Sequence, residues 1–438
     1  MALLFTVMLV TAAGNTAMHS VMPSIGTALK INDVWISLAY SWSALLWVMC
    51  APMWARRSDK RGRKAMMALG LVGFIASMSL CGLVLWMGFA GWITGVATLF
   101  LFALARSAYG GFGSAAPPAV QAYVASRTSR SERTKALSLV ASSFGLGTVV
   151  GPVLAPLMII PFFGIGLTGP AWCFALLGVV TLIVLRLRLP DDEPKFAARG
   201  KTFSDPNSGV SDSDALEDDV SEEAPEEDGG LPVGEQKRLR WFEPRLRHWV
   251  IASLAGGHAQ AMIMGITGFL VLDRLGLREN FTEGARLVSL VMVFGAIATL
   301  LAQWGIIPRF RIGPRVATIS GLIVAAFGTA ILGVADTVVG LCLGYAIASL
   351  GFGLFRPGTT AGTSLAVTRA EQGQASGITA SVAGASFIYA PGLGVWLYSV
   401  SDWLGFGTII AVCLVVAMVG ARSLTADEVL TVDRETFE

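Results

Sequence analysis

Long apolar segments recur along the chain, and each is long enough to cross a lipid bilayer. A spanning helix needs about 20 predominantly apolar residues, and the first segment, residues 3–24, carries one ionisable side chain, His19. Lipid offers the backbone no hydrogen-bond partners, so only helices and closed barrels can span it. Because the segments are too long and too continuously apolar for barrel strands, they predict an all-α membrane protein.

Twelve such segments can be placed, six on each side of an acidic stretch. They lie at 3–24, 34–55, 65–87, 92–118, 136–159, 169–187, 248–272, 284–307, 315–334, 337–361, 376–398 and 402–421. Charged residues make up 14% of the chain, against about 25% in an ordinary soluble domain. The sequence has no phosphate-binding loop Gly-x-x-x-x-Gly-Lys-Ser/Thr and no catalytic constellation. We therefore expect neither an ATP-driven pump nor an enzyme, and no metal, cofactor or nucleic acid.

Positive charges in the short loops gather on one face of the predicted bundle. The loop at 56–64 holds six lysine and arginine residues, and further basic residues lie at 127–135 and 309–315. Short loops that are rich in lysine and arginine stay in the cytoplasm. The pattern predicts a multi-pass protein of the cell (inner) membrane with both termini in the cytoplasm.

The segment between the sixth and seventh spans, residues 190–247, differs in composition from the rest. It combines many acidic residues with serine, glycine and proline and has almost no aromatic residues. Because such a composition cannot bury enough apolar surface to fold, we predict a flexible cytoplasmic linker, with a regulatory docking segment as the alternative. It joins an N-terminal half, residues 1–189, to a C-terminal half, residues 248–421. A cytoplasmic tail, residues 422–438, follows.

The two halves resemble each other. The tripeptide Gly-Phe-Gly at 111–113, followed by Pro117, recurs 240 positions later at 351–353, followed by Pro357. Related six-helix halves are typical of secondary transporters, whose binding site lies at the interface of the repeats near mid-membrane. We therefore predict two pseudo-symmetric halves with a cavity between them.

Two arginines lie more than one helical turn inside predicted spans, where a charged side chain is costly. An arginine at mid-span costs about 2.5–3.5 kcal/mol on insertion scales. Arg106 lies well inside the segment 92–118, whereas Arg356 lies near the end of 337–361, where a long side chain could instead reach the membrane surface. Both are candidates for the cavity.

Two histidines occupy comparable places in the halves. His19 and His258 are 239 residues apart, close to the repeat interval. Histidine titrates near neutral pH and could carry a coupled proton, whereas a neutral hydrogen-bonded contact between helices is the alternative for each. Further candidates for the cavity are Asn15, Thr16, Tyr109 and Gln260.

The middle of every predicted span lacks aspartate and glutamate. A cavity with two arginines and two histidines but no carboxylate has a positive potential. Such a cavity favours anionic or zwitterionic solutes over lipophilic cations.

The basic loop resembles a known signature. Residues 55–64 are similar to the motif that the major facilitator superfamily carries after its second span, Gly-x-x-x-Asp-Arg-x-Gly-Arg-Arg/Lys, with alanine for the first glycine and lysine for the first arginine. The resemblance implies the major facilitator fold. It also implies a conformational latch whose carboxylate docks on a helix N-terminus, a favourable partner for an anion. The latch residues would be Asp59, Gly62, Arg63 and Lys64.

Two more segments resemble motifs of that superfamily. Residues 106–110 are similar to its span-four motif Arg-x-x-Gln-Gly, with Tyr109 in place of glutamine, and this resemblance implies a role of Arg106 in proton coupling. The span-five motif Gly-x-x-x-Gly-Pro-x-x-Gly is matched by Gly147, Gly151 and Pro152. In the superfamily this motif marks proton-driven exporters, so the resemblance implies efflux.

One departure from those exporters matters. Many carry an aspartate nine positions before a proline of the first span, and here, counted from Pro23, that place is Gly14. His19 or another group would then have to carry the proton. We expect a monomeric, proton-coupled exporter of a small organic solute that works by alternating access. A symporter that imports an organic anion and a non-transporting membrane sensor or scaffold are the alternatives.

Overall fold

The computed structural model describes residues 2–125, 143, 145–160, 165–190, 239–240, 242–367 and 372–427. The first group of helices consists of α1 (Ala2–Ala28), α2 (Asp33–Leu38), α3 (Ser41–Arg61), α4 (Arg63–Phe89), α5 (Gly95–Gly111), α6 (Ala116–Ala125), the fifth-span helix (Gly145–Met158) and α8 (Gly169–Arg188). The second group consists of α10 (Arg247–Arg274), α11 (Phe281–Leu300), α12 (Ile307–Phe310), α13 (Pro314–Val334), α14 (Val338–Leu365), α15 (Gln372–Val400) and α16 (Asp402–Ser423). The prediction of an all-α membrane protein is confirmed.

Within the described residues, ten helical stretches are long and apolar enough to cross a membrane. The two other predicted spans, 136–159 and 376–398, correspond to the shorter apolar fifth-span helix and to α15. The count of twelve therefore stays a prediction. Residues 191–238 and 428–438 lie outside the described part, so the linker and most of the tail stay predictions too.

Some predicted spans are not single helices. The segment 34–55 is interrupted at Ala39 and Tyr40, where α2 ends before α3 begins. The segment 92–118 passes through a short 3-10 turn before α6, whose second and third residues are Pro117 and Pro118. A proline restricts the residue before it and has no N–H to donate, which explains the new helix start. Our sequence prediction treated both segments as continuous.

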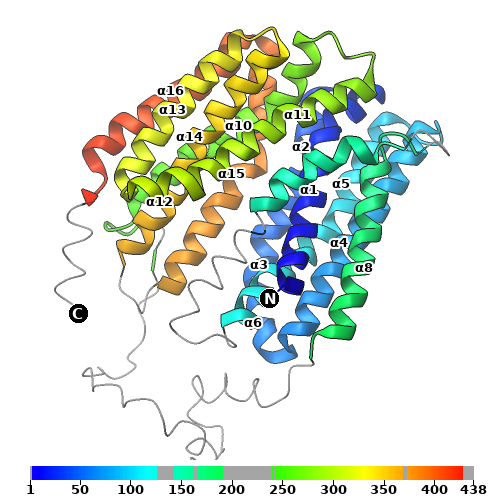
Figure 1. Cartoon of the computed structure of the whole chain (residues 1–438), viewed down its shortest axis with the longest axis horizontal. Helices are drawn as coiled ribbons and strands as arrows, with labels where there is room; N and C mark the ends of the chain where they lie inside the picture. The colour runs from blue at the N-terminus through cyan, green and yellow to red at the C-terminus, as the bar shows by residue number, and fades with distance from the viewer. Residues whose placement is uncertain are drawn as a thin grey trace, which may run out of the picture.

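Figure 1 shows the two groups side by side, with α1 to α8 in blue to green and α10 to α16 in green to red. One end of the bundle carries the connections at 29–32, 90–94 and 275–280, and we call it the Asp33 face. The opposite end, where α3 meets α4, is the Gly62 face. In Figure 1, α1 begins and α16 ends at the Gly62 face.

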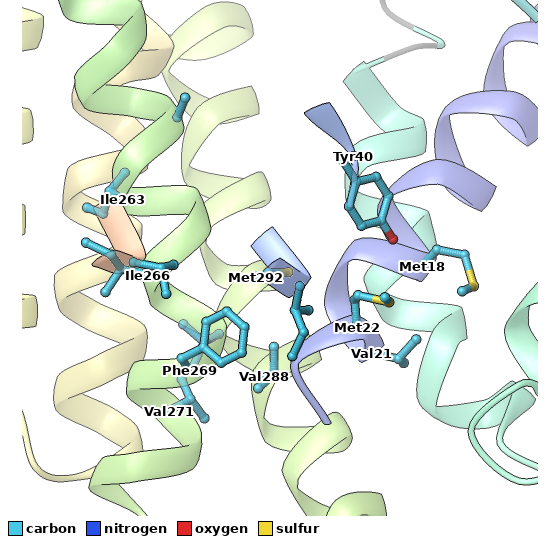
Figure 2. Packing of buried hydrophobic residues seen from close by; sticks show 14 of the residues in the cluster. Met18, Val21, Met22, Tyr40, Ile263, Ile266, Phe269, Val271, Val288 and Met292 are labelled. Carbon is cyan, nitrogen blue, oxygen red and sulfur yellow. The ribbon is translucent and has the colours of Figure 1, made fainter. Parts of the chain in front are cut away.

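The two groups contact each other toward the Asp33 face. A Cβ on Gly268 of α10 would collide with Pro23 of α1, and one on Gly392 of α15 would lie 2.5 Å from Leu38 of α2. Figure 2 shows apolar side chains of α1, α10 and α11 gathered in this region. Burial of such side chains without voids holds packed helices in register.

Candidate functional site

A cavity of about 420 Å³ is lined by side chains from both groups of helices. Its walls come from α1, α2, α3, α5, the fifth-span helix, α10, α11, α14 and α15. It brings together seven of the predicted site residues: Asn15, Thr16, His19, Arg106, Tyr109, Gln260 and Arg356. The volume suits a drug-sized ligand, for which sites of about 300–1,000 Å³ are typical.

Arg106 of α5 is almost fully buried, with 3% of its surface exposed. Its Nη2 donates a hydrogen bond to Asn15 Oδ1 at 2.6 Å. Its guanidinium lies 4.7 Å from the ring centroid of Tyr40 and 4.9 Å from that of Tyr109, a cation–π geometry. Nε and Nη1 have no hydrogen-bond partner among the described residues. The side chain is therefore fixed in position while part of its donor capacity is unused.

Tyr40 connects Arg106 to the cavity histidine. Its ring is stacked on His19, with the ring centroids 3.7 Å apart and the planes at 23°. The Trp47 and Tyr109 rings lie 5.2 Å apart, and Tyr109 also contacts Arg106. Aromatic rings thus surround the arginine and the histidine, and they limit how either side chain can move.

The second group contributes Arg356 and Gln260. The Arg356 guanidinium lies 5.6 Å from the ring centroid of Phe387, and its nitrogens make neither an ion pair nor a hydrogen bond with any residue that the structure describes. The side-chain oxygen of Gln260 is buried and has no hydrogen-bond partner among the described residues. Each group of helices therefore supplies one arginine to the cavity.

His258 is not among the residues that line the cavity. Its Nδ1 donates to the carbonyl oxygen of Leu254 at 2.6 Å, and its ring lies 4.9 Å from that of Tyr389. This geometry is that of a histidine engaged in contacts within and between helices. The structure thus brings His19 to the cavity but does not bring His258 there.

The span-five glycines allow a close approach to α1. A Cβ on Gly147 would lie 2.6 Å from the Cβ of Ala12, and one on Gly151 would collide with Thr16 Oγ1. Thr16 Oγ1 in turn donates to the carbonyl oxygen of Gly147 at 3.1 Å. Pro152 is buried beside this contact. Small residues four apart let two membrane helices meet at backbone distance, here at the cavity wall.

The residues of the predicted latch lie where α3 meets α4. Gly62 has φ 87° between the two helices, a conformation that glycine adopts at little cost. Arg63 and Lys64 open α4, and Lys64 is buried. The side chain of Asp59 lies outside the described part of the structure, so the docking of its carboxylate stays a prediction.

A salt bridge joins the two groups at the Asp33 face. Arg278, which follows α10, donates to both carboxylate oxygens of Asp33 at 3.0 and 2.7 Å, and its Nε donates to Asp273 at 2.6 Å. The hydrogen bond to Asp33, against an opposing effect of burial, holds the pKa of Arg278 above its ordinary value. The guanidinium is therefore charged at every physiological pH, and we call this contact the Asp33–Arg278 bridge.

A second arginine at that face is also paired. Arg274 donates to Asp336 and to Asp402, each at 2.6 Å. The arginines of the Asp33 face are thus balanced by acids.

Several cavity residues were not predicted from the sequence. They are aromatic or small polar side chains: Tyr40, Trp47, Thr148, Phe269 and Phe387. Trp47 carried a usable signal, because tryptophan concentrates at membrane surfaces and this one lies in the middle of a predicted span. The phenylalanines carried none, since they are common on every face of a membrane helix.

The chain is similar to known membrane transporters. The profile described as the Major Facilitator Superfamily matches residues 4–310. A "Probable actinorhodin transporter" of Streptomyces coelicolor is 27% identical over 415 residues, which cover 84% of this chain and 66% of that protein. The class B tetracycline resistance protein of Escherichia coli is 33% identical over 143 residues, 32% of this chain and 31% of that protein. The chain thus spans just under two thirds of the first relative's length and less of the second.

A solved structure shares the fold. The peptide transporter POT in complex with sulfate has a TM-score of 0.67 and 17% identity, covering 96% of this chain and 93% of that chain. An identity this low supports the shared architecture alone.

Proposed function

The chain belongs to the Major Facilitator Superfamily and is a multi-pass membrane transporter, and we propose that it exports a small organic solute by proton-coupled alternating access. The observation that carries the proposal is the cavity between the two groups of helices, with one arginine from each. None of the described side chains that line it is an aspartate or a glutamate. The positive potential favours an anionic or zwitterionic solute.

Alternating access requires the halves, residues 1–189 and 248–421, to rock about the cavity. The Asp33–Arg278 bridge and the close contacts of Gly268 and Gly392 join them at the Asp33 face. The positive-inside rule favours an orientation in a bacterial inner membrane with the Gly62 face toward the cytoplasm. In that orientation, a conformation that is closed at the Asp33 face would admit solute from the cytoplasm. The conformational latch would hold the opposite state.

His19 is our candidate for the coupling proton, because it lines the cavity and stacks on Tyr40 beside Arg106. A bulky solute would strip water from His19, and loss of water disfavours the charged form of a histidine. Solute and proton would then compete for the cavity, which is the coupling that an antiporter needs. The names of the two relatives, an antibiotic transporter and a resistance protein, support efflux.

A second candidate function, import of an organic anion with protons, is favoured by the same neighbourhood. An anion bound near Arg106 would also attract a proton to His19, because opposite charges favour the charged form. Solute and proton would then bind together, which is the coupling of a symporter. The two candidates differ in whether loss of water or attraction of charge dominates at His19.

Transport in inverted membrane vesicles tests both. A panel of anionic, zwitterionic and cationic aromatic compounds is offered with and without an imposed proton gradient, acidic inside, and uptake into the vesicle reports export. We expect gradient-dependent uptake of anionic or zwitterionic compounds, with protons leaving the vesicle as solute enters. Solute leaving together with protons would establish the symporter instead. Accumulation of cations alone would contradict both.

A further inference from the structure

The cavity contains an unneutralised pair of cations. Arg106 has 3% of its surface exposed, and no acidic side chain lines the cavity within the described residues. A buried charge without a partner is strongly unfavourable, and its retention inside a membrane marks a functional site. The missing negative charge would come from the ligand.

Both arginines line the cavity beside aromatic rings and can bind an acid. Each guanidinium lies over aromatic rings, Arg106 over Tyr40 and Tyr109 and Arg356 over Phe387. Arg106 is further fixed by Asn15 but keeps Nε and Nη1 without a described partner. A planar guanidinium presents a rigid fork that pairs with a carboxylate through two hydrogen bonds. The Arg106 fork is already held in place by Asn15, so it loses little entropy on binding.

The rest of the wall is mostly apolar and aromatic. Besides the rings that hold the arginines, Trp47 and Phe269 face the same space, with the flexible side chains of Met22, Met264 and Met292. Aromatic faces prefer flat ring partners, and methionine adapts to irregular shapes and to aromatic edges. A wall of this kind suits an aromatic ring system.

We propose that the ligand is an aromatic compound with two acidic groups, one bound by Arg106 and the other by Arg356. The proposal rests on the proposed function only in taking this cavity as the ligand site, and it does not depend on transport or its direction. Because the two arginines belong to different groups of helices, a ligand that engages both attracts the halves toward each other. A compound with one acidic group can pair with only one half and leaves the other arginine without a counter-ion.

Equilibrium binding to the purified full-length chain in lipid nanodiscs tests the proposal without any gradient. The probes are naphthalene-2,6-dicarboxylate, 2-naphthoate and naphthalene-2,6-dicarboxamide, which share a ring system and differ in charge. We expect the diacid to bind at least about tenfold more tightly than the monoacid, because its second carboxylate makes an additional charge-assisted contact. The neutral diamide should bind most weakly.

Arg106→Gln and Arg356→Gln should each remove the preference for the diacid over the monoacid, while Arg286→Gln keeps it. Arg286 is the matched control because it is exposed and lies outside the cavity. Size-exclusion profiles verify folding, and either variant alone suffices if the other misfolds. Equal affinity for diacid and monoacid, preference for the diamide, or no binding of any probe would overturn the proposal. A diacid preference without transport would instead remove the proposed function and leave this inference intact.

Discussion

Arg106 makes three contacts at the cavity: a hydrogen bond to Asn15 and cation–π contacts with Tyr40 and Tyr109. Replacement by alanine deletes all three and leaves Asn15 without its donor. We expect Arg106→Ala to abolish transport and Arg106→Lys to reduce it roughly ten- to hundredfold, because an ammonium lacks the fork. Initial transport rates in vesicles measure this, normalised to inserted protein. Rates near those of the unmodified chain would exclude a role in binding.

His19 and His258 provide a matched pair for the proton. Only the first lines the cavity, while the second bonds to Leu254 within its own helix. We expect His19→Gln to lose the dependence of transport on an imposed pH gradient and His258→Gln to keep it. The measurement is the ratio of transport with and without the gradient. The opposite pattern would assign the proton to His258.

For single residues, the sequence indicated which charged side chains are important but not which way each side chain faces. A buried arginine or histidine is rare enough in a span to be noticed, so Arg106 and His19 could be predicted. Whether His258 faces a cavity or a neighbouring helix depends on how α10 is rotated about its axis. The sequence does not reveal that rotation, because apolar residues are spread over every face of α10. Phe387 could not be found because its importance comes from Arg356 across the helix contact.

Among the elements, the contact of the fifth-span helix with α1 is especially sensitive to size. Gly151→Ala would force its Cβ against Thr16, and overpacking of a well-packed contact costs about 1–3 kcal/mol. We expect lower thermal stability and loss of transport. Gly407→Ala in α16 is the control, since nothing lies within 4 Å of the added atom. An unaffected Gly151→Ala protein would show that the helices separate freely.

The N-terminus of α13 is capped from a distant part of the chain. Asp427, beyond α16, accepts hydrogen bonds from the backbone N–H of Arg315 at 2.7 Å and of Val316 at 3.2 Å. A carboxylate at this position satisfies free donors and the helix dipole. We expect Asp427→Ala to lower the free energy of unfolding by about 1 kcal/mol.

Asp427→Asn should lose only part of that stability, because its amide keeps one acceptor oxygen for the two donors. Thermal unfolding in detergent compares the three proteins. Equal melting temperatures would mean that the cap contributes nothing measurable.

Element positions were predictable because the apolar segments are long. The predicted limits of α8, α13 and α16 lie within one or two residues of those observed. The break at Tyr40 was not predictable, since no proline or glycine marks it. The cap by Asp427 joins residues 112 positions apart, and no local pattern reports such a contact.

For the whole molecule, the Asp33–Arg278 bridge is a contact that opening toward the Asp33 face must break. Partly exposed ion pairs contribute about 0.2–1 kcal/mol, which changes a two-state population by at most about fivefold. We expect Asp33→Asn and Arg278→Gln each to increase labelling of Ser37→Cys, a cavity position, by an impermeant maleimide. The reagent is applied from the Asp33 side to a background without other cysteines.

Labelling in the double variant should be only slightly higher than in either single variant, because both substitutions remove the same contact. Fully additive effects would show that the residues act independently. Unchanged labelling in all three would mean that the bridge does not bias the equilibrium.

The short helix α2 connects the cavity wall to the salt bridge between the halves. It has six residues, about 9 Å at 1.5 Å per residue, and it begins with Asp33 and ends at Leu38, two residues before Tyr40. A ligand that displaces the Tyr40 ring would therefore move α2 as a rigid helix. The first residue of α2, Asp33, forms the salt bridge that joins the halves. One alanine inserted after Trp35 would rotate Asp33 by about 100° relative to Tyr40. Ligand binding should then no longer be coupled to opening of the Asp33–Arg278 bridge.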